Sequence, residues 1–245
     1  MEYNVWSAEL FCHGAPYDPW GVEHSEAMNA ISLDEAFDHL DRMLDDPDVH
    51  DLFNPEQLVL GLTMAYSNCL TDFPFCYLRA GTKERRIRGI LNLKKLYDNF
   101  FARYCFAPYS HPQSQVSQTG TMQHLCENFW DRFVLFPSGE METSYIDAGL
   151  DVMEHALGIP NDHCISSGLE GIASWAYACE LQGISRTRNL LLGWKSQASA
   201  TNPDLMAFGR QMLVSLPVAG HPPNTTDSLT PTPSPRRPLS QNHLR

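Results

Sequence analysis

The adjacent residues His50 and Asp51 form the first grouping in the sequence that could perform chemistry. Imidazole and carboxylate ligands together suit a divalent metal ion that activates water for phosphoester hydrolysis. The ligands that would complete such a site lie elsewhere in the chain, as His24 or His39 upstream and as Asp72, Asp131 or Asp151 downstream. One hypothesis is therefore a metal-dependent phosphohydrolase with catalytic residues His50 and Asp51 and metal ligands His24, His50 and Asp51. The dipeptide is common, and here it follows Pro47 in an acidic turn, which favours a solvent-exposed role.

A second grouping contains Asp151, Glu154, His155 and His163. Two histidines and a carboxylate could bind zinc, but the spacing does not place both imidazoles on one helical face, as an HExxH motif would. A capping or solvent-facing role is favoured for these residues.

The seven cysteines include no CxxC pair, so a zinc site built on thiolates has no framework. Cys12 precedes His13 and Cys164 follows His163, but a nucleophile and its base normally come from different elements of a fold. An odd number of cysteines in a chain of this length favours reduced thiols, with Cys126 and Cys164 as small buried apolar residues. Motifs of the forms GxxxxGK[ST], GxGxxG and GxSxG are absent, and no cofactor is expected.

Composition narrows the class of protein. The chain has 245 residues, 43% of them hydrophobic, and a net charge of -12. This charge argues against a protein that coats nucleic acid or an anionic membrane surface. The longest nearly apolar stretch, 58–66, is far shorter than the roughly 20 residues that span a bilayer, and the first thirty residues do not resemble a signal peptide. We expect a soluble, cytoplasmic protein.

Charge is distributed unevenly along the sequence. Residues 1–60 contain fourteen acidic side chains and one basic side chain, whereas residues 79–103 contain eight basic and two acidic ones. One interpretation is that the two segments face each other and neutralise one another. The other is that the acidic segment is a surface for a basic protein partner. The candidate binding residues of that surface are Asp34, Asp38, Asp41, Asp45 and Asp48.

Apolar residues recur at helical spacing through most of the chain. A capping box at Ser32 predicts a helix over 33–46, and Asn54 followed by Pro55 predicts another to about residue 69. Further helices are predicted over 82–105, with a polar stripe that we expect to be solvated, and from 122 to Pro137.

The last third contains a weak internal repeat. A shift of 41 residues aligns Ser144 with Ser185 and Gly168 with Gly209, and most apolar positions stay apolar. Each unit has the pattern of two helices joined by a turn, which is typical of HEAT-like helical arrays. Gly168 and Gly171 are predicted to allow a close approach of two helices.

One segment resembles known proteins. Residues 164–175, CISSGLEGIASW, are similar to the Leu-His-Gly-Leu-Gly-His-Trp segment of uncharacterised bacterial helical-repeat proteins, with Leu169, Gly171 and Trp175 in matching places. Glu170 and Ser174 replace the two histidines of that pattern. The resemblance covers about residues 145–216 and implies a helical-repeat fold, but no function tied to those histidines.

The two ends of the chain differ from the middle. Residues 1–21 mix aromatic residues with Gly and Pro, which predicts an extended arm whose aromatics pack on the body. Residues 217–245 are rich in Pro, Ser and Thr and predict a disordered tail. Between them, residues 22–216 are predicted to form an all-α domain of antiparallel helical pairs in a HEAT-like array.

Such an array presents extended surfaces to other proteins. We therefore expect a non-catalytic protein–protein interaction module that binds a basic partner, with the phosphohydrolase as the alternative. Small acidic helical proteins include immunity proteins that neutralise nuclease toxins. The analogy with this chain rests on charge and fold class alone.

Overall fold

The computed structural model describes residues 1–12, 25–106, 120–138, 141–197 and 202–216, and in these ranges every regular element is helical. The all-α prediction is confirmed. None of the helices in this part of the chain has the length and hydropathy needed to span a membrane. The 217–245 tail lies outside the described residues.

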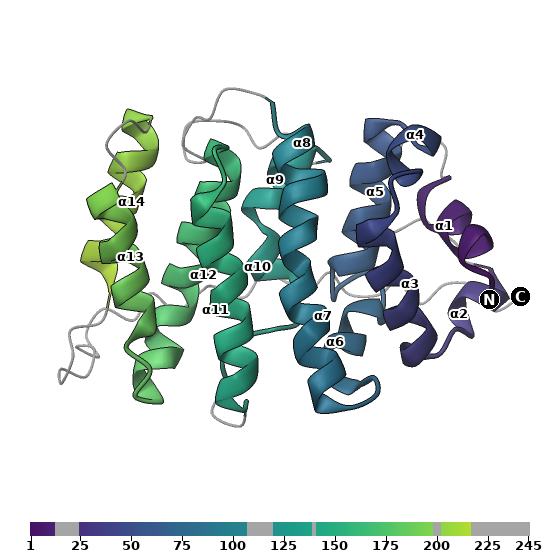
Figure 1. Ribbon diagram of the computed structural model, residues 1–245, viewed down its shortest axis with the longest axis horizontal. Coiled ribbons are helices and arrows are strands. Elements are labelled where there is room, and N and C mark those ends of the chain that lie inside the picture. Colours follow the sequence, from purple (N-terminus) through teal and green to yellow (C-terminus); the bar gives the residue numbers. More distant parts are fainter. Residues whose placement is uncertain (13–24, 107–119, 139–140, 198–201, 217–245) are drawn as a thin grey trace, which may run out of the picture.

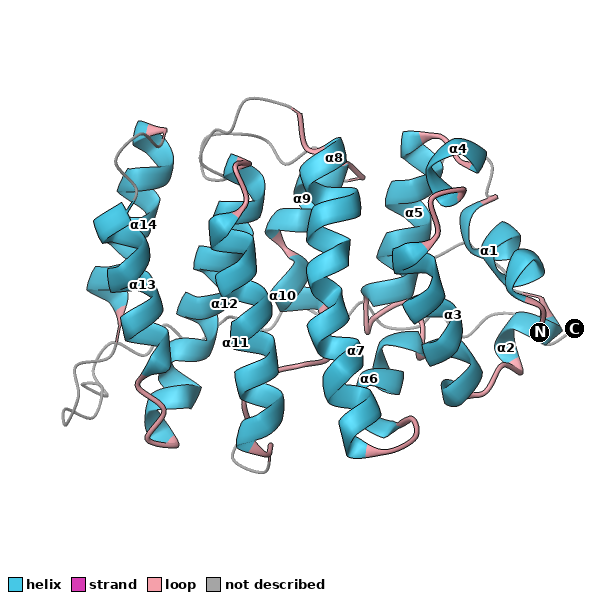
Figure 2. Cartoon of the chain, viewed as in Figure 1, coloured by secondary structure: helices cyan, strands magenta, loops and turns pink. Residues whose placement is uncertain are grey.

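Figure 2 shows the helices of the described residues and the loops between them. In chain order they are α1 (Tyr3–Phe11), α2 (Glu26–Asn29), α3 (Leu33–Asp45), α4 (Val49–Leu52), α5 (Pro55–Tyr66), η1 (Phe73–Phe75), α6 (Cys76–Arg79), α7 (Lys83–Leu96), η2 (Tyr97–Phe101), α8 (Ala102–Tyr104), α9 (Met122–Glu127), α10 (Phe129–Arg132), α11 (Thr143–Gly158), α12 (Asp162–Leu181), α13 (Arg186–Gln197) and α14 (Pro203–Ser215).

The longer helices alternate between two layers along the molecule (Figure 1). One layer contains α3, α7, α11 and α13, and the other contains α5, α9, α12 and α14, with each helix packed on its neighbours in the same layer. α11 and α12 form the most extensive pair, and α13 and α14 follow it as a second pair. This alternation agrees with the predicted antiparallel pairs, while the finer HEAT-like arrangement stays a prediction.

Local signals fix where helices begin. α3 begins with the predicted capping box, in which the Ser32 hydroxyl accepts the Glu35 N–H and the Glu35 carboxylate accepts the Ser32 N–H. α5 begins with an equivalent box between Asn54 and Gln57 and ends at Tyr66, earlier than predicted. These boxes satisfy backbone N–H groups that the first turn of a helix leaves unpaired.

Two predicted helices are interrupted. The helix expected over 82–105 widens into a π-helical turn, η2, whose Tyr97, Phe100 and Phe101 are buried. The helix expected from 122 is divided at Asn128, whose side-chain amide donates to the His124 carbonyl at 2.9 Å. A side chain that bonds the backbone locally competes with helix continuation.

The expected extended arm is wrong over the residues that the structure describes near the N-terminus. Residues 3–11 form α1, which packs on α5 and buries Trp6, Leu10 and Phe11. The Phe11 ring lies against Gly61, where an added Cβ would be 2.1 Å from it. The aromatics therefore anchor the segment as predicted, but from a helix. The rest of the arm, 13–21, lies outside the described residues.

Two glycines allow close helix packing, as predicted. A Cβ at Gly168 would lie 2.9 Å from the Met153 carbonyl oxygen of α11, and a Cβ at Gly171 would lie 2.5 Å from the Trp130 ring. In the repeat partner of Gly168, Gly209, a Cβ would lie 2.3 Å from Trp194. Small residues at these positions thus let α12 and α14 approach their neighbours.

Gly168→Val should lower the free energy of unfolding by about 1 to 3 kcal/mol, because the new side chain meets backbone that cannot rotate away. The measurement is chemical denaturation followed by circular dichroism. Gly193→Ala is the matched control, since nothing lies within 4 Å of a Cβ there, and it should leave stability equal or slightly higher. Equal effects of the two substitutions would contradict the packing role of Gly168.

Candidate functional site

The acidic residues of α3 lie against the basic residues of α7. Arg85 donates to Asp34 at 2.6 Å and to Asp38 at 2.5 Å, and Lys95 donates to Asp45 at 2.7 Å. The side chain of Arg85 is 23% exposed, so it is mostly covered by these contacts. The prediction that the two charged segments face each other is confirmed for these pairs.

Uncharged amides extend the same line of contacts. The Asn92 amide donates to Asp41 at 2.6 Å, and the Asn99 amide donates to the Leu44 carbonyl at 2.8 Å. We call the contacts from Asp34–Arg85 to Leu44–Asn99 the α3–α7 ladder. The expectation that this stripe of α7 is solvated is therefore wrong for its ladder residues. Among the predicted binding residues, Asp48 lies outside the ladder and is exposed, with its N–H bonded to Asp46.

His50 has an aromatic environment. Its Nδ1 lies 3.1 Å from the Tyr104 hydroxyl, and its ring lies 4.7 Å from that of Phe100. Burial lowers the pKa of His50, and the nearby Arg103 guanidinium adds to this effect. Asp51 is exposed.

The other proposed ligands of the phosphohydrolase lie apart. His39 Nε2 lies 2.9 Å from the Met1 carbonyl, and Asp151 pairs with Arg186 at 2.5 Å. His24 is outside the described residues. Across the described ranges, no three His, Cys, Asp or Glu side chains are arranged to hold a metal ion.

The residues of the second grouping point to different partners. Arg186 contacts Asp151 and Glu154 and fastens α13 to α11, whereas His155 Nε2 lies 2.8 Å from Asp98. His163 is buried and turns toward α9, where its Nδ1 lies 2.7 Å from Glu127. The structure thus does not bring these residues together as one site.

The cysteines of the described ranges are all free thiols. Cys12 is exposed, whereas Cys126 and Cys164 are buried, as predicted for small apolar residues. Burial raises the pKa of Cys126 well above its usual value, which disfavours a reactive thiolate.

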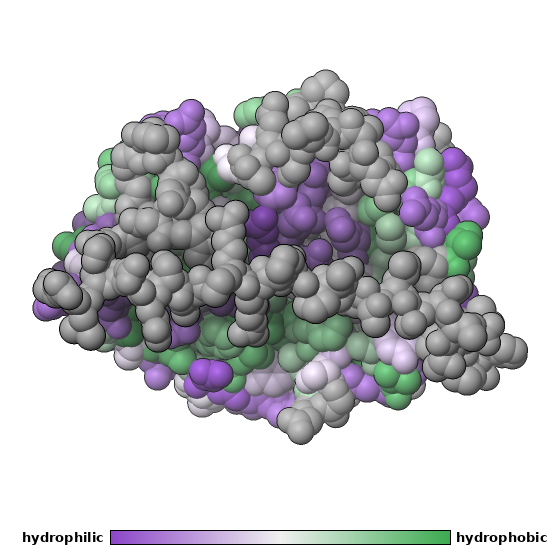
Figure 3. Space-filling view, turned by 180° about the vertical axis from the view of Figure 1, so that it is seen from behind, coloured by the Kyte–Doolittle hydropathy of each residue, from purple (hydrophilic) through white to green (hydrophobic). Residues whose placement is uncertain are grey.

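A group of carboxylates on the face opposite that seen in Figure 1 was not predicted from the sequence. We call Glu127 of α9, Asp131 of α10 and Glu170 of α12 the acidic hollow. In Figure 3, hydrophilic residues gather in a hollow near the middle of this face, over α9, α10 and α12.

Polar contacts at the edge of the acidic hollow hold its side chains in place. His163 holds the Glu127 carboxylate, as described above. His124 lies 3.2 Å from the Asn128 amide and 2.8 Å from the Arg132 guanidinium. Burial, with a contribution from Arg132, lowers the pKa of His124, which favours the neutral form of this side chain.

Glu170 is the most perturbed acid of the hollow. Its pKa is raised to about 7, first by burial and then by the negative charges of Asp131 and Glu127. Neither Glu170 nor Asp131 has an ion-pair partner among the described residues. Strongly shifted pKa values concentrate at functional sites, because such groups are poised to change charge. Chemically, the hollow can accept a proton or pair with a positively charged group.

One sequence signal pointed toward this site. Glu170 is the one charged residue of the segment 164–175, which otherwise consists of apolar and small residues. In the structure residues 164–172 are buried except Glu170. The proximity of Asp131 and Glu127, which are more than thirty positions away in the chain, had no local signal.

Comparison of the chain with known protein families, curated proteins and solved structures finds no match. The resemblance of residues 164–175 to helical-repeat proteins therefore stays a prediction.

Reversing Asp38, Asp41 and Asp45 to Lys should lower the melting temperature, because three cations would then face the basic side of α7. Exposed pairs contribute up to about 1 kcal/mol each, so the loss should be on the order of 1 to 3 kcal/mol. The control is Asp48→Lys combined with Asp51→Lys, which changes exposed acids outside the ladder. Equal melting temperatures for the triple reversal and wild type would contradict an intramolecular role for the ladder.

His50→Ala should cost about 1 to 2 kcal/mol through lost packing and a lost hydrogen bond, whereas Asp51→Ala should cost less than about 0.5 kcal/mol. Thermal melts measure both. Elemental analysis of the natively purified protein is the accompanying test of the metal hypothesis. About one equivalent of metal in wild type, lost in both variants, would instead support the phosphohydrolase.

Proposed function

We propose that this protein is a non-catalytic binding module whose acidic hollow takes a positively charged group of a protein partner, as an adaptor or immunity-type protein would. The net charge of -12 favours association with basic partners through long-range attraction.

The unbalanced charge of the acidic hollow is the observation that carries this proposal. Burial raises the pKa of Glu170 to about 7, and the negative charges of Asp131 and Glu127 lie close enough to add to this shift. A Lys or Arg side chain of a partner would remove the like-charge repulsion and restore the ionised form of Glu170. The hollow therefore gains more from a cation than an isolated surface carboxylate does.

The carboxylates of α3 support the proposal less strongly. Asp34, Asp38 and Asp45 already have cationic partners on α7, so a basic protein would compete with intramolecular pairs. Asp48 has no such partner and could contribute at the edge of an interface. For this reason we place the contact at the hollow and treat the α3 surface as the alternative that the test separates.

The phosphohydrolase alternative stays a prediction. The contacts of His50 with Tyr104 and Phe100 give it no further support, and the metal analysis described above tests it.

Titration with an octalysine peptide at low salt tests the proposal by proton release. At pH 7 Glu170 is about half protonated, and pairing with a cation lowers its pKa, so binding should release on the order of half a proton. Calorimetry in two buffers of different ionisation enthalpy measures this release. Glu170→Gln should abolish the proton release, and Asp131→Asn combined with Glu170→Gln should weaken binding several-fold.

The matched control is Asp38→Asn combined with Asp45→Asn, which removes two carboxylates from the α3 surface. This variant should keep both the affinity and the proton release. Loss of affinity in the control with no change in the hollow variants would move the contact to α3 and overturn the assignment to the hollow.

Glu170 also predicts a pH dependence of stability. Because its pKa is higher in the folded protein than the usual 4.5, the folded state binds more protons between about pH 5 and 7. The contribution of Glu170 protonation to the free energy of unfolding is therefore complete below pH 4.5 and decreases as the pH rises through 7. After allowance for solvent screening the decrease should be about 1 to 2 kcal/mol, and Glu170→Gln should flatten it.

A further inference from the structure

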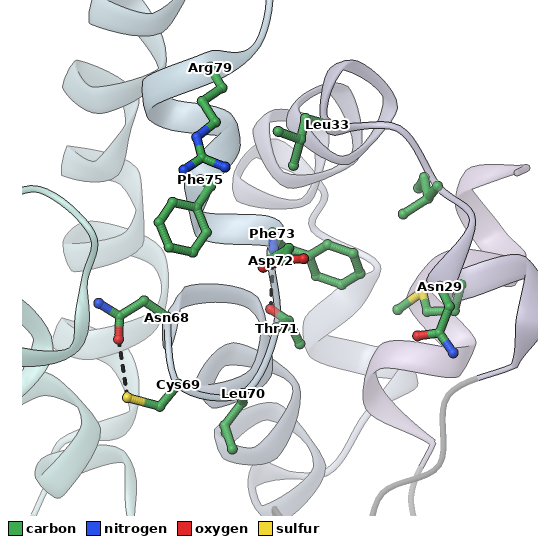
Figure 4. Close-up of a pocket in the computed structure, with 12 residues that line it drawn as sticks. Asn29, Leu33, Asn68, Cys69, Leu70, Thr71, Asp72, Phe73, Phe75 and Arg79 are labelled. Atoms are coloured by element: carbon green, nitrogen blue, oxygen red, sulfur yellow. Dashed lines mark hydrogen bonds between the residues drawn. The ribbon is translucent and has the colours of Figure 1, made fainter.

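A second feature, separate from the acidic hollow, is a cavity of about 470 Å³ in the N-terminal part of the array. Figure 4 shows its two walls. One wall comes from α2, the turn after it and the start of α3, with Ile31 and Leu33. The other comes from the segment between α5 and α6, with Leu70 and Phe75. Its volume is in the range of sites that hold small molecules or peptide ends.

Arg79 supplies the cation of this cavity. Its guanidinium lies over the Phe75 ring, 4.7 Å from the ring centre, which holds the planar group in place. Arg85 and Arg186 bind carboxylates, but Arg79 has no carboxylate partner in the described part of the chain. Its N–H donors are therefore available to an acceptor from outside.

Asn68 adds a polar group at the same cavity. The Cys69 thiol donates to the Asn68 side-chain oxygen at 3.2 Å, and the Asn68 backbone N–H donates to the Arg132 carbonyl at 3.1 Å. These contacts occupy the amide oxygen and fix the backbone, so the side-chain NH₂ is left as a donor.

The lining discriminates among anions. Asp72 also lines the cavity and would repel a doubly charged phosphate more than a singly charged carboxylate. The apolar side chains of both walls favour a ligand with an apolar body, because its burial adds hydrophobic stabilisation.

We propose that this cavity binds a monocarboxylate with an apolar body, its carboxylate on Arg79 and its body between Leu33 and Leu70. The same chemistry is available from a free apolar acid or from the C-terminal end of a peptide with apolar last residues. Arg suits this role because its planar fork matches a carboxylate.

Calorimetric or NMR titration of the full chain separates the two sources. The free-acid probes are octanoate and 4-phenylbutyrate, each compared with its neutral amide. The peptide probe is N-acetyl-Gly-Leu-Leu, compared with its C-terminal amide. Either the free acids or the peptide acid should bind at least about tenfold more tightly than the corresponding amides. The reason is that the amide loses the charge-assisted hydrogen bond to Arg79.

Two arginine substitutions locate the binding. Arg79→Gln should weaken binding of the acid about tenfold, and Arg79→Lys should weaken it less, because charge remains but the fork is lost. Arg88→Gln on α7, an exposed position outside the cavity, is the matched control and should leave affinity unchanged. Melting curves of all variants check that the fold is intact.

Preferential binding of octanoate or phenylbutyrate would assign the cavity to free acids, and preferential binding of the peptide acid would assign it to chain ends. Equal binding of acids and amides, absence of binding by every probe, or binding unaffected by Arg79→Gln would overturn the proposal.

Discussion

The array depends on α7, which uses two of its sides against two neighbours. One side forms the α3–α7 ladder, in which partners are separated by 47 to 55 residues along the chain. The other side packs on α11, where Arg86 donates to the Tyr145 hydroxyl at 2.7 Å. A nearly constant separation means that the helices of this layer run parallel and in register. Part of the uneven charge of the sequence, Asp34, Asp38 and Asp45 against Arg85 and Lys95, is thus paired between the helices of this layer.

Close packing holds α12 against its neighbours α11 and α10. Gly168 brings α12 against the backbone of α11, and Gly171 receives the Trp130 ring of α10. Trp130 in turn meets Trp175 edge to face, with ring centres 5.5 Å apart. Close-packed contacts of this kind leave little freedom of position. They also fix the spacing of α10 and α12, the two helices that carry Asp131 and Glu170.

The two acidic regions differ because their surroundings differ. The carboxylates of α3 face cations, so their negative charge is satisfied within the chain. Glu170 faces Asp131 and Glu127 from a partly buried position, so its charge is opposed by burial and by like charges. A positively charged partner changes the energy of the second region more than that of the first. Composition alone counts all these residues equally and does not distinguish the two regions.

The sequence by itself determined the helical class, the starts of α3 and α5, the complementarity of the charged segments and the need for glycine at 168 and 171. Capping and helical periodicity act within a few residues, and charge segregation is visible in any linear count. Tertiary structure decided that residues 3–11 fold as a helix, that Asn128 divides α9 from α10, and that Glu127 meets His163. It also decided the formation of the acidic hollow. Glu170 lies more than thirty positions from Glu127 and Asp131 in the chain, and these like charges become neighbours only because packed helices bring them together.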